Sequence, residues 1–172
     1  MDTISLVVHV TAAAILFGPQ VLMFYAVTPA TWMLGNEETR RGVVKVVAGR
    51  FGRLTAVALA VLLVTGLYQF YSIVPEPVRS DFGAYRFGTL FMWKMGGFTL
   101  IVVLIGVHVL AFARRIARLS DAVIAGDESK RPALETARSQ SFLFSLILLV
   151  VTFVTLALGV ALGDESYSWV AK

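Results

Sequence analysis

Three ionisable side chains interrupt otherwise apolar stretches of the sequence, namely His9, Lys94 and His108. Ionisable groups are costly in hydrocarbon, so within membrane segments they usually face the interior of a helix bundle and mark a functional site. A neutral imidazole is a good ligand for haem iron, copper or zinc. The chain has no cysteine, which excludes disulfides, thiolate metal sites and cysteine nucleophiles. We therefore expect cofactor chemistry to centre on these three side chains.

Helical geometry places these groups on shared faces. Lys94 and His108 are fourteen residues apart, which leaves them about 40° apart around a helix and roughly 20 Å apart along it. His9 and Gln20 are eleven residues apart and lie about 20° from each other on an earlier helix. If the two polar stripes face each other, His9 pairs with Lys94, and Gln20 approaches His108.

The different depths of the two histidines limit how they can bind a haem. We do not expect His9 and His108 to hold the same iron from opposite faces. His9 is the candidate for one axial ligand, with Lys94, Met92 or Met95 as the second, or with the second position open. His108 is left as the candidate ligand of a separate haem or as a packing residue.

A porphyrin also needs clearance and cations for its propionates. Gly96, Gly97 and Gly106 give room on the helix that carries Lys94, and Arg50 and Arg53 lie at the end of the preceding one. The same glycines can instead allow close helix packing. The two arginines can equally be anchors at the membrane surface, and Lys94 can extend its ammonium to the nearer surface.

The elements that position these residues follow from the distribution of charge. Of the 172 residues, 58% are hydrophobic and only 15% are charged. Crossing hydrocarbon takes about 20 apolar residues, and such segments must be helical because lipid offers no hydrogen-bond partners. Four spans are expected, at about 4–32, 54–74, 87–113 and 142–162. The sequence thus predicts an all-α integral membrane protein, a single domain over 1–172 that forms an antiparallel four-helix bundle.

Lys and Arg residues predict the orientation of this bundle. Eleven of them lie in the first and third loops, against Arg79 and Arg86 in the second. By the positive-inside rule, the first and third loops are cytoplasmic and both termini face outward. We expect the first span to be retained, because no basic segment precedes it. The expected location is a bacterial-type cytoplasmic (inner) membrane, with several passes.

Glycine and proline predict the irregular points. Gly18-Pro19 should kink the first span, and Pro29 should lie near its far end. The cytoplasmic loop 114–140 is expected to contain short helices: a continuation of the third span that ends at Gly126-Asp127, and a second helix that opens near Pro132.

Several short motifs resemble a known family. His9 followed by Ala14–Gly18 resembles the first helix of the copper-resistance D-like membrane proteins. The stretches Arg50–Thr55 and Thr65-Gly66-Leu67 look like their second helix, and Trp93-Lys94 begins a segment similar to their third. The same superfamily includes the integral-membrane type of protoporphyrinogen oxidase, a haem-binding protein. The resemblance covers residues 5 to about 110 and implies a four-helix fold with haem bound at His9.

Three functions are therefore weighed. The first is a membrane protein that binds haem b or a related porphyrin, in redox chemistry or porphyrin oxidation. The second is copper transport or resistance, with His9, Met92 and Met95 as metal ligands. The third is a non-catalytic accessory subunit of a larger membrane complex. Expected partners are the lipid bilayer, a membrane redox partner or larger complex, and a homo-oligomer, whereas nucleic acid is not expected because the basic residues flank apolar runs.

Overall fold

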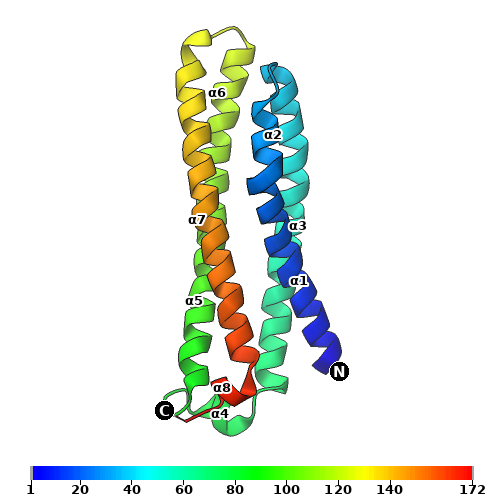
Figure 1. Cartoon of the computed structure of the whole chain (residues 1–172), viewed down its shortest axis with the longest axis vertical. Coiled ribbons are helices and arrows are strands. Elements are labelled where there is room, and N and C mark those ends of the chain that lie inside the picture. Colours follow the sequence, from blue (N-terminus) through cyan, green and yellow to red (C-terminus); the bar gives the residue numbers. More distant parts are fainter. Residues whose placement is uncertain (1, 172) are drawn as a thin grey trace. The chain divides into compact units, whose positions relative to one another are not determined.

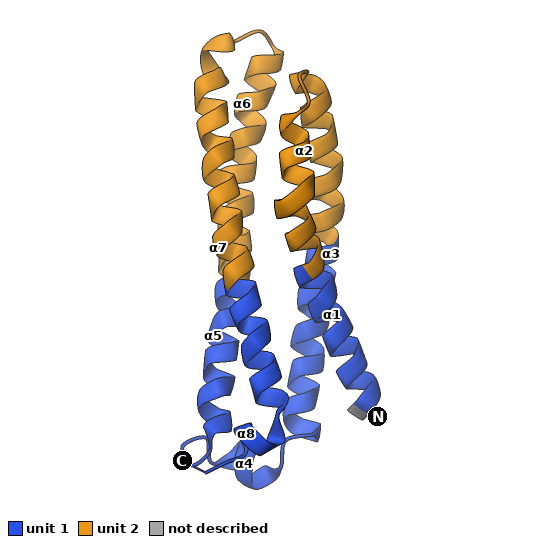
Figure 2. Ribbon diagram, viewed as in Figure 1, with its two compact units in different colours: residues 1–17, 54–100, 151–172 blue, residues 18–53, 101–150 orange. Residues whose placement is uncertain are grey.

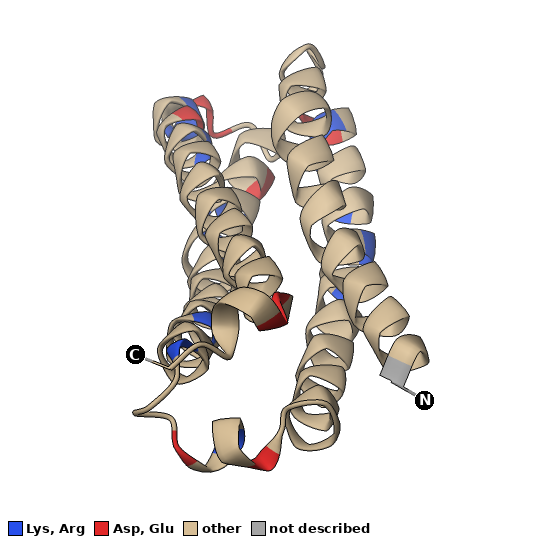
Figure 3. Ribbon diagram, turned by 60° about the horizontal axis from the view of Figure 1, so that its bottom comes forward, with Lys and Arg blue, Asp and Glu red and all other residues tan. Residues whose placement is uncertain are grey.

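The computed structural model of the protein describes residues 2–171, and 89% of the chain is helical. No strand forms within that range, and only an isolated bridge pairs Tyr85 with Ala171. Four helical stretches are long and apolar enough to cross a membrane (Figure 1): Thr3–Trp32, Glu37–Ser72, Arg86–Ile124 and Glu128–Gly163. Most of the ribbon of these four stretches is formed by residues other than Lys, Arg, Asp and Glu (Figure 3). The all-α fold with four apolar segments is confirmed.

The first stretch is helical throughout but changes its winding. It consists of α1 (Asp2–Leu22), a π-helical turn at Met23–Val27, and α2 (Thr28–Trp32). Pro19 lies inside α1, and the departure from α-helical geometry comes just after it. Pro29 lies in the first turn of α2, near the end of the stretch as expected.

The second stretch corrects the prediction of a first cytoplasmic loop. A single helix, α3 (Glu37–Ser72), begins well before the expected span at 54, so only residues 33–36 separate it from α2. The Asn36 side chain accepts a hydrogen bond from the Thr39 amide at 2.9 Å, as a helix N-cap does. Most of the basic residues assigned to the first loop therefore lie on a helix.

The third and fourth stretches confirm one boundary and correct another. The third comprises α5 (Arg86–Val107), a π-helical turn at His108–Ala113, and α6 (Arg114–Ile124). It ends as predicted at Gly126, whose φ of 100° requires glycine. A short 3-10 turn then leads into α7 (Arg131–Gly163), which carries Pro132 in its first turn. The second short helix expected in 114–140 is thus the start of α7 itself.

The loop between the second and third stretches is partly ordered by aromatic packing. It contains α4 (Glu76–Ser80), and α8 (Glu165–Ser168) follows α7. Phe70, Phe82, Phe87 and Phe91 form a cluster in which each ring has a neighbour within 5.9 Å between centroids. Phe87 is almost fully buried, so this cluster fixes the end of α3 against the start of α5.

Two compact units divide the chain (Figure 2). Unit 1 comprises Met1–Phe17, Leu54–Leu100 and Val151–Lys172, and unit 2 comprises Gly18–Arg53 and Ile101–Val150. Each long helix contributes one part to each unit. His9 and Lys94 belong to unit 1, whereas Gln20 and His108 belong to unit 2.

Small residues bring the helices of unit 1 close together. Ala12 and Leu16 of α1 pack with Ala58 and Leu62 of α3, and Phe98 of α5 lies against this cluster. Buried surfaces of this kind bring the polar side chains of neighbouring turns within hydrogen-bond distance.

Gly97 provides a test of the packing between α5 and α7. A Cβ atom at this position would collide with the Thr155 hydroxyl, so Gly97→Ala is expected to lower the free energy of unfolding by about 1–3 kcal/mol. The adjacent Gly96 has no atom within 4 Å of the corresponding position, which makes Gly96→Ala the matched control. Thermal unfolding in detergent measures both, and equal midpoints for the two variants would contradict the close contact.

Candidate functional site

Polar side chains connect α1 and α3 in unit 1. The Gln69 amide donates to the Ser5 carbonyl oxygen at 3.2 Å. One turn further along α1, His9 Nδ1 lies 2.7 Å from Thr65 Oγ1. Gly66 leaves space beside the ring, because a Cβ atom there would lie 3.5 Å from His9 Cε1. The imidazole is therefore held in a defined position between the two helices.

The hydrogen bonds of Thr65 decide the tautomer of this imidazole. Thr65 Oγ1 lies 2.7 Å from the Val61 carbonyl oxygen, one turn earlier on α3. A hydroxyl has a single proton, so a Thr65 hydroxyl that donates to Val61 accepts from His9, and Nδ1 then carries the proton. Nε2 of His9 is then the nitrogen with the free lone pair. Metal-binding histidines are oriented in this way, through a hydrogen bond donated by the other ring nitrogen.

Lys94 lies in the same unit as His9. The lysine side chain runs against α7, where Cε and Nζ would each lie 3.6 Å from a Cβ atom at Gly159. Nothing in the sequence pattern had singled out Gly159.

The two methionines proposed as metal ligands are placed differently. Met92 is 66% exposed, and the neighbouring Trp93 is 69% exposed, so this face of α5 points outward. Met95 is half-buried. Among residues 2–171, no three His, Cys, Asp or Glu side chains converge as they would around a metal ion.

Gln20 and His108 both lie in unit 2. Gln20 is buried. His108 begins the π-helical turn and packs against Phe112 and Phe144, with ring centroids 6.1 and 5.9 Å away. Its Nδ1 is buried without a hydrogen-bond partner in the described part of the chain.

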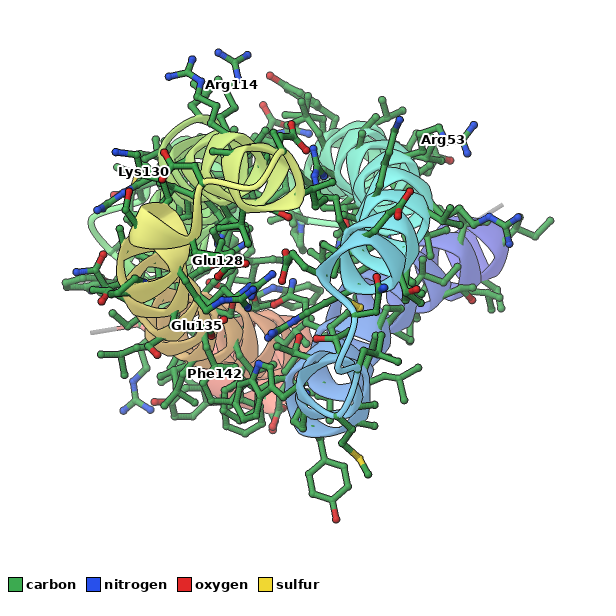
Figure 4. All side chains as sticks on the ribbon, turned by 90° about the horizontal axis from the view of Figure 1, so that it is seen from above. Arg53, Arg114, Glu128, Lys130, Glu135 and Phe142 are labelled. Atoms are coloured by element: carbon green, nitrogen blue, oxygen red, sulfur yellow. The ribbon has the colours of Figure 1, made fainter. Side chains whose placement is uncertain are left out.

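Arg50 and Arg53, the predicted propionate partners, are both exposed. Arg53 Nε contacts the Gly49 carbonyl oxygen of its own helix at 3.4 Å. Figure 4 shows Arg53 projecting from the outer edge of α3, as Arg114 does from its own helix. Both positions suit a cation at the membrane surface.

Unit 2 contains a buried cluster of charges that was not predicted from the sequence. Arg138 Nη2 donates to Glu37 Oε1 at 2.6 Å, and Ser120, fully buried, donates to the same oxygen. Glu37 is the first residue of α3, well before the apolar part that the sequence predicts from about residue 54. Burial raises the pKa of the Glu37 carboxyl, but hydrogen bonds from Arg138 and Ser120 outweigh it and hold that pKa below its ordinary value. The cluster joins α3, α6 and α7.

Comparison with known proteins gives no relative from which a function could be transferred. No protein family, curated protein or solved structure matches the chain. The account of its function therefore depends on the chemistry of its own residues.

Proposed function

We propose that the protein is a multi-pass membrane protein that binds haem b, or a related porphyrin, through His9 and serves in redox chemistry or porphyrin oxidation. The observation that carries this proposal is the hydrogen bond between His9 Nδ1 and Thr65. It leaves Nε2 as the free donor atom of an oriented imidazole. When bound, the haem would supply one-electron chemistry at its iron.

The residues around His9 have separate roles in this proposal. Thr65 holds the ring and, as the acceptor, keeps the proton on Nδ1, and the backbone at Gly66 lies beside the ring edge. Lys94 supplies a second donor nitrogen or a positive charge for a propionate, from the opposite pair of helices in unit 1. Apolar neighbours such as Leu62 exclude water from this part of the unit.

The charges of the two units support the orientation inferred above. Unit 2 holds eleven Lys and Arg residues against six Asp and Glu, whereas unit 1 holds four against five. The positive-inside rule then assigns the loops of unit 2 to the cytoplasm and both termini to the outer side. Within an antiparallel bundle of this orientation, His9 and Lys94 lie toward the outer leaflet of a bacterial-type inner membrane.

One purification tests this proposal against its rivals. The full chain is expressed with haem available, purified in detergent, and examined by absorption and by metal analysis. A Soret band with sharp bands on reduction supports the haem proposal. A colourless protein that retains copper would support transport or resistance instead. A colourless, metal-free protein that copurifies with other subunits would favour an accessory role.

Thr65 offers a finer prediction. Thr65→Val keeps the shape of the side chain but removes the acceptor for His9, so haem affinity is expected to fall about 10–100-fold, the usual cost of losing the group that orients a ligand. Thr65→Ser keeps the hydroxyl and should bind haem as the wild type does. Haem titration followed at the Soret band measures both. Equal affinities for Val and Ser would show that the hydroxyl does not orient the ligand.

A further inference from the structure

Unit 2 contains a polar hollow that the proposed haem site does not use. It has a volume of about 420 Å³ and is lined by Trp32, Arg40, Glu135, Arg138 and Ser139. These residues come from the end of α2, the start of α3 and the first turns of α7. Two arginines and a carboxylate around one space can recognise a charged ligand.

Arg40 is the least satisfied of the lining groups. The residue is only 9% exposed, yet its guanidinium makes no hydrogen bond within the described part of the chain. The nearest carboxylate oxygen is Glu135 Oε1, 3.6 Å from Nη1, which is too long for a hydrogen bond. Arg138 differs, because Glu37 and Glu135 accept from it at 2.6 and 2.7 Å. Arg40 therefore pairs with Glu135 through charge alone, and its N–H donors are open to a hydrogen-bonded ligand.

The charged side chains around the hollow indicate which charged groups a ligand should carry. Arg40 and Arg138 share the Glu135 carboxylate, which lies 3.6 Å from Arg40 Nη1 and 2.7 Å from Arg138 Nη1, so an anion beside Arg40 would give its guanidinium hydrogen-bonded partners of its own. The carboxylate of Glu135, whose side chain is 51% exposed, also borders the space and would repel a ligand that is only anionic. Glu37 and Glu135 balance the two arginines, so the hollow has no net charge to neutralise. A ligand with one phosphate and one ammonium group matches this pattern best.

The surroundings of the hollow indicate a lipid as the source of those groups. Trp32 ends the first apolar stretch and contacts Phe142 edge to face, with centroids 5.1 Å apart. Phe142 in turn stacks on Phe24 at 4.5 Å. Glu135 and Phe142 are seven residues apart on α7 and so share one face of that helix (Figure 4). An aromatic surface thus continues from the polar hollow toward the apolar segments, where an acyl chain can lie.

We propose that this hollow binds a phospholipid whose headgroup carries a phosphate and a primary ammonium, with Arg40 holding the phosphate and Glu135 accepting from the ammonium. The aromatic surface of Phe24, Trp32 and Phe142 contacts its chains. The bound lipid would join the end of α2 to α3 and α7 within unit 2. This site is independent of His9 and of the proposed haem.

Native mass spectrometry of the delipidated full chain tests the proposal. Dioleoyl phosphatidylethanolamine, phosphatidylcholine and phosphatidylglycerol are added separately at equal concentrations. We expect one phosphatidylethanolamine to be retained preferentially, because the quaternary ammonium of choline has no N–H to donate and glycerol has no cation for Glu135. Arg40→Gln should weaken retention by at least about tenfold, as expected for lost charge-assisted hydrogen bonds. Glu135→Gln should reduce the preference for ethanolamine over choline.

Arg53→Gln is the matched control, since it removes an exposed arginine of the same helix that lies outside the hollow. Arg40→Lys keeps the positive charge and should retain part of the binding. This variant keeps the proposal testable if Arg40→Gln fails to fold. Equal losses in Arg40→Gln and Arg53→Gln would overturn the proposal, as would preferential retention of phosphatidylglycerol. Equal binding of soluble glycerophosphoethanolamine would exclude a lipid as the ligand.

Discussion

Replacing His9 by alanine is expected to lower haem affinity by at least about 100-fold. Losing only the group that orients a ligand costs about 10–100-fold, and this change removes the ligand itself. Haem content per chain, measured by the pyridine haemochrome of protein purified in detergent, gives the result directly. The bound haem should fall from near one per chain to background.

His108→Ala is the control for this experiment. It removes the only other histidine, which packs on Phe112 and Phe144, so it should reduce stability while leaving haem in place. If the His108→Ala protein lost haem and the His9→Ala protein kept it, the haem ligand would be His108 in unit 2. Equal haem content in the wild type, His9→Ala and His108→Ala proteins would show that neither histidine is needed to bind haem.

Arg138→Gln is expected to destabilise the protein on the order of 3 kcal/mol, the usual cost of breaking a buried ion pair. The change leaves Glu37 without its cation, and the two side chains are only 12% and 10% exposed. Chemical or thermal unfolding in detergent measures the loss. Arg131→Gln removes an exposed ion pair with Glu128 nearby on the chain, and its unfolding should match that of the wild type.

The pH dependence of this cluster has a defined sign. The pKa of Glu37 is lower in the folded protein than its ordinary value, so its ion pair stabilises fully above that ordinary value. The stabilisation is lost as the pH falls through the folded pKa. Wild-type protein should therefore lose more stability on acidification than Glu37→Gln does. Equal losses, or an Arg138→Gln variant as stable as wild type, would contradict the buried pair.

The sequence was sufficient for the parts of the fold that hydropathy determines. Four charge-poor segments predicted four helices, and Gly126 predicted the end of α6 because only glycine adopts its backbone conformation easily. In each case the residues of one short stretch of sequence determine the structure that forms there.

Other features depend on contacts between distant residues. Hydropathy predicts a loop in place of the charged first half of α3, because it cannot show that Glu37 contacts Arg138, which lies 101 residues later. The partner of His9 was also missed, although Thr65 lay in a motif already singled out. A threonine hydroxyl that bonds the carbonyl oxygen one helical turn earlier is common in helices, and only the contact with His9 gives this one a role.

The central claim, that His9 presents Nε2 as a free ligand atom, is tested most directly by ¹⁵N NMR of the histidine rings in the haem-free protein. The chain has two histidines, so the His108→Ala variant assigns both signals. The hydrogen bond to Thr65 predicts a neutral His9 ring with the proton on Nδ1 and none on Nε2. A signal showing the proton on Nε2, or a doubly protonated ring, would contradict the account.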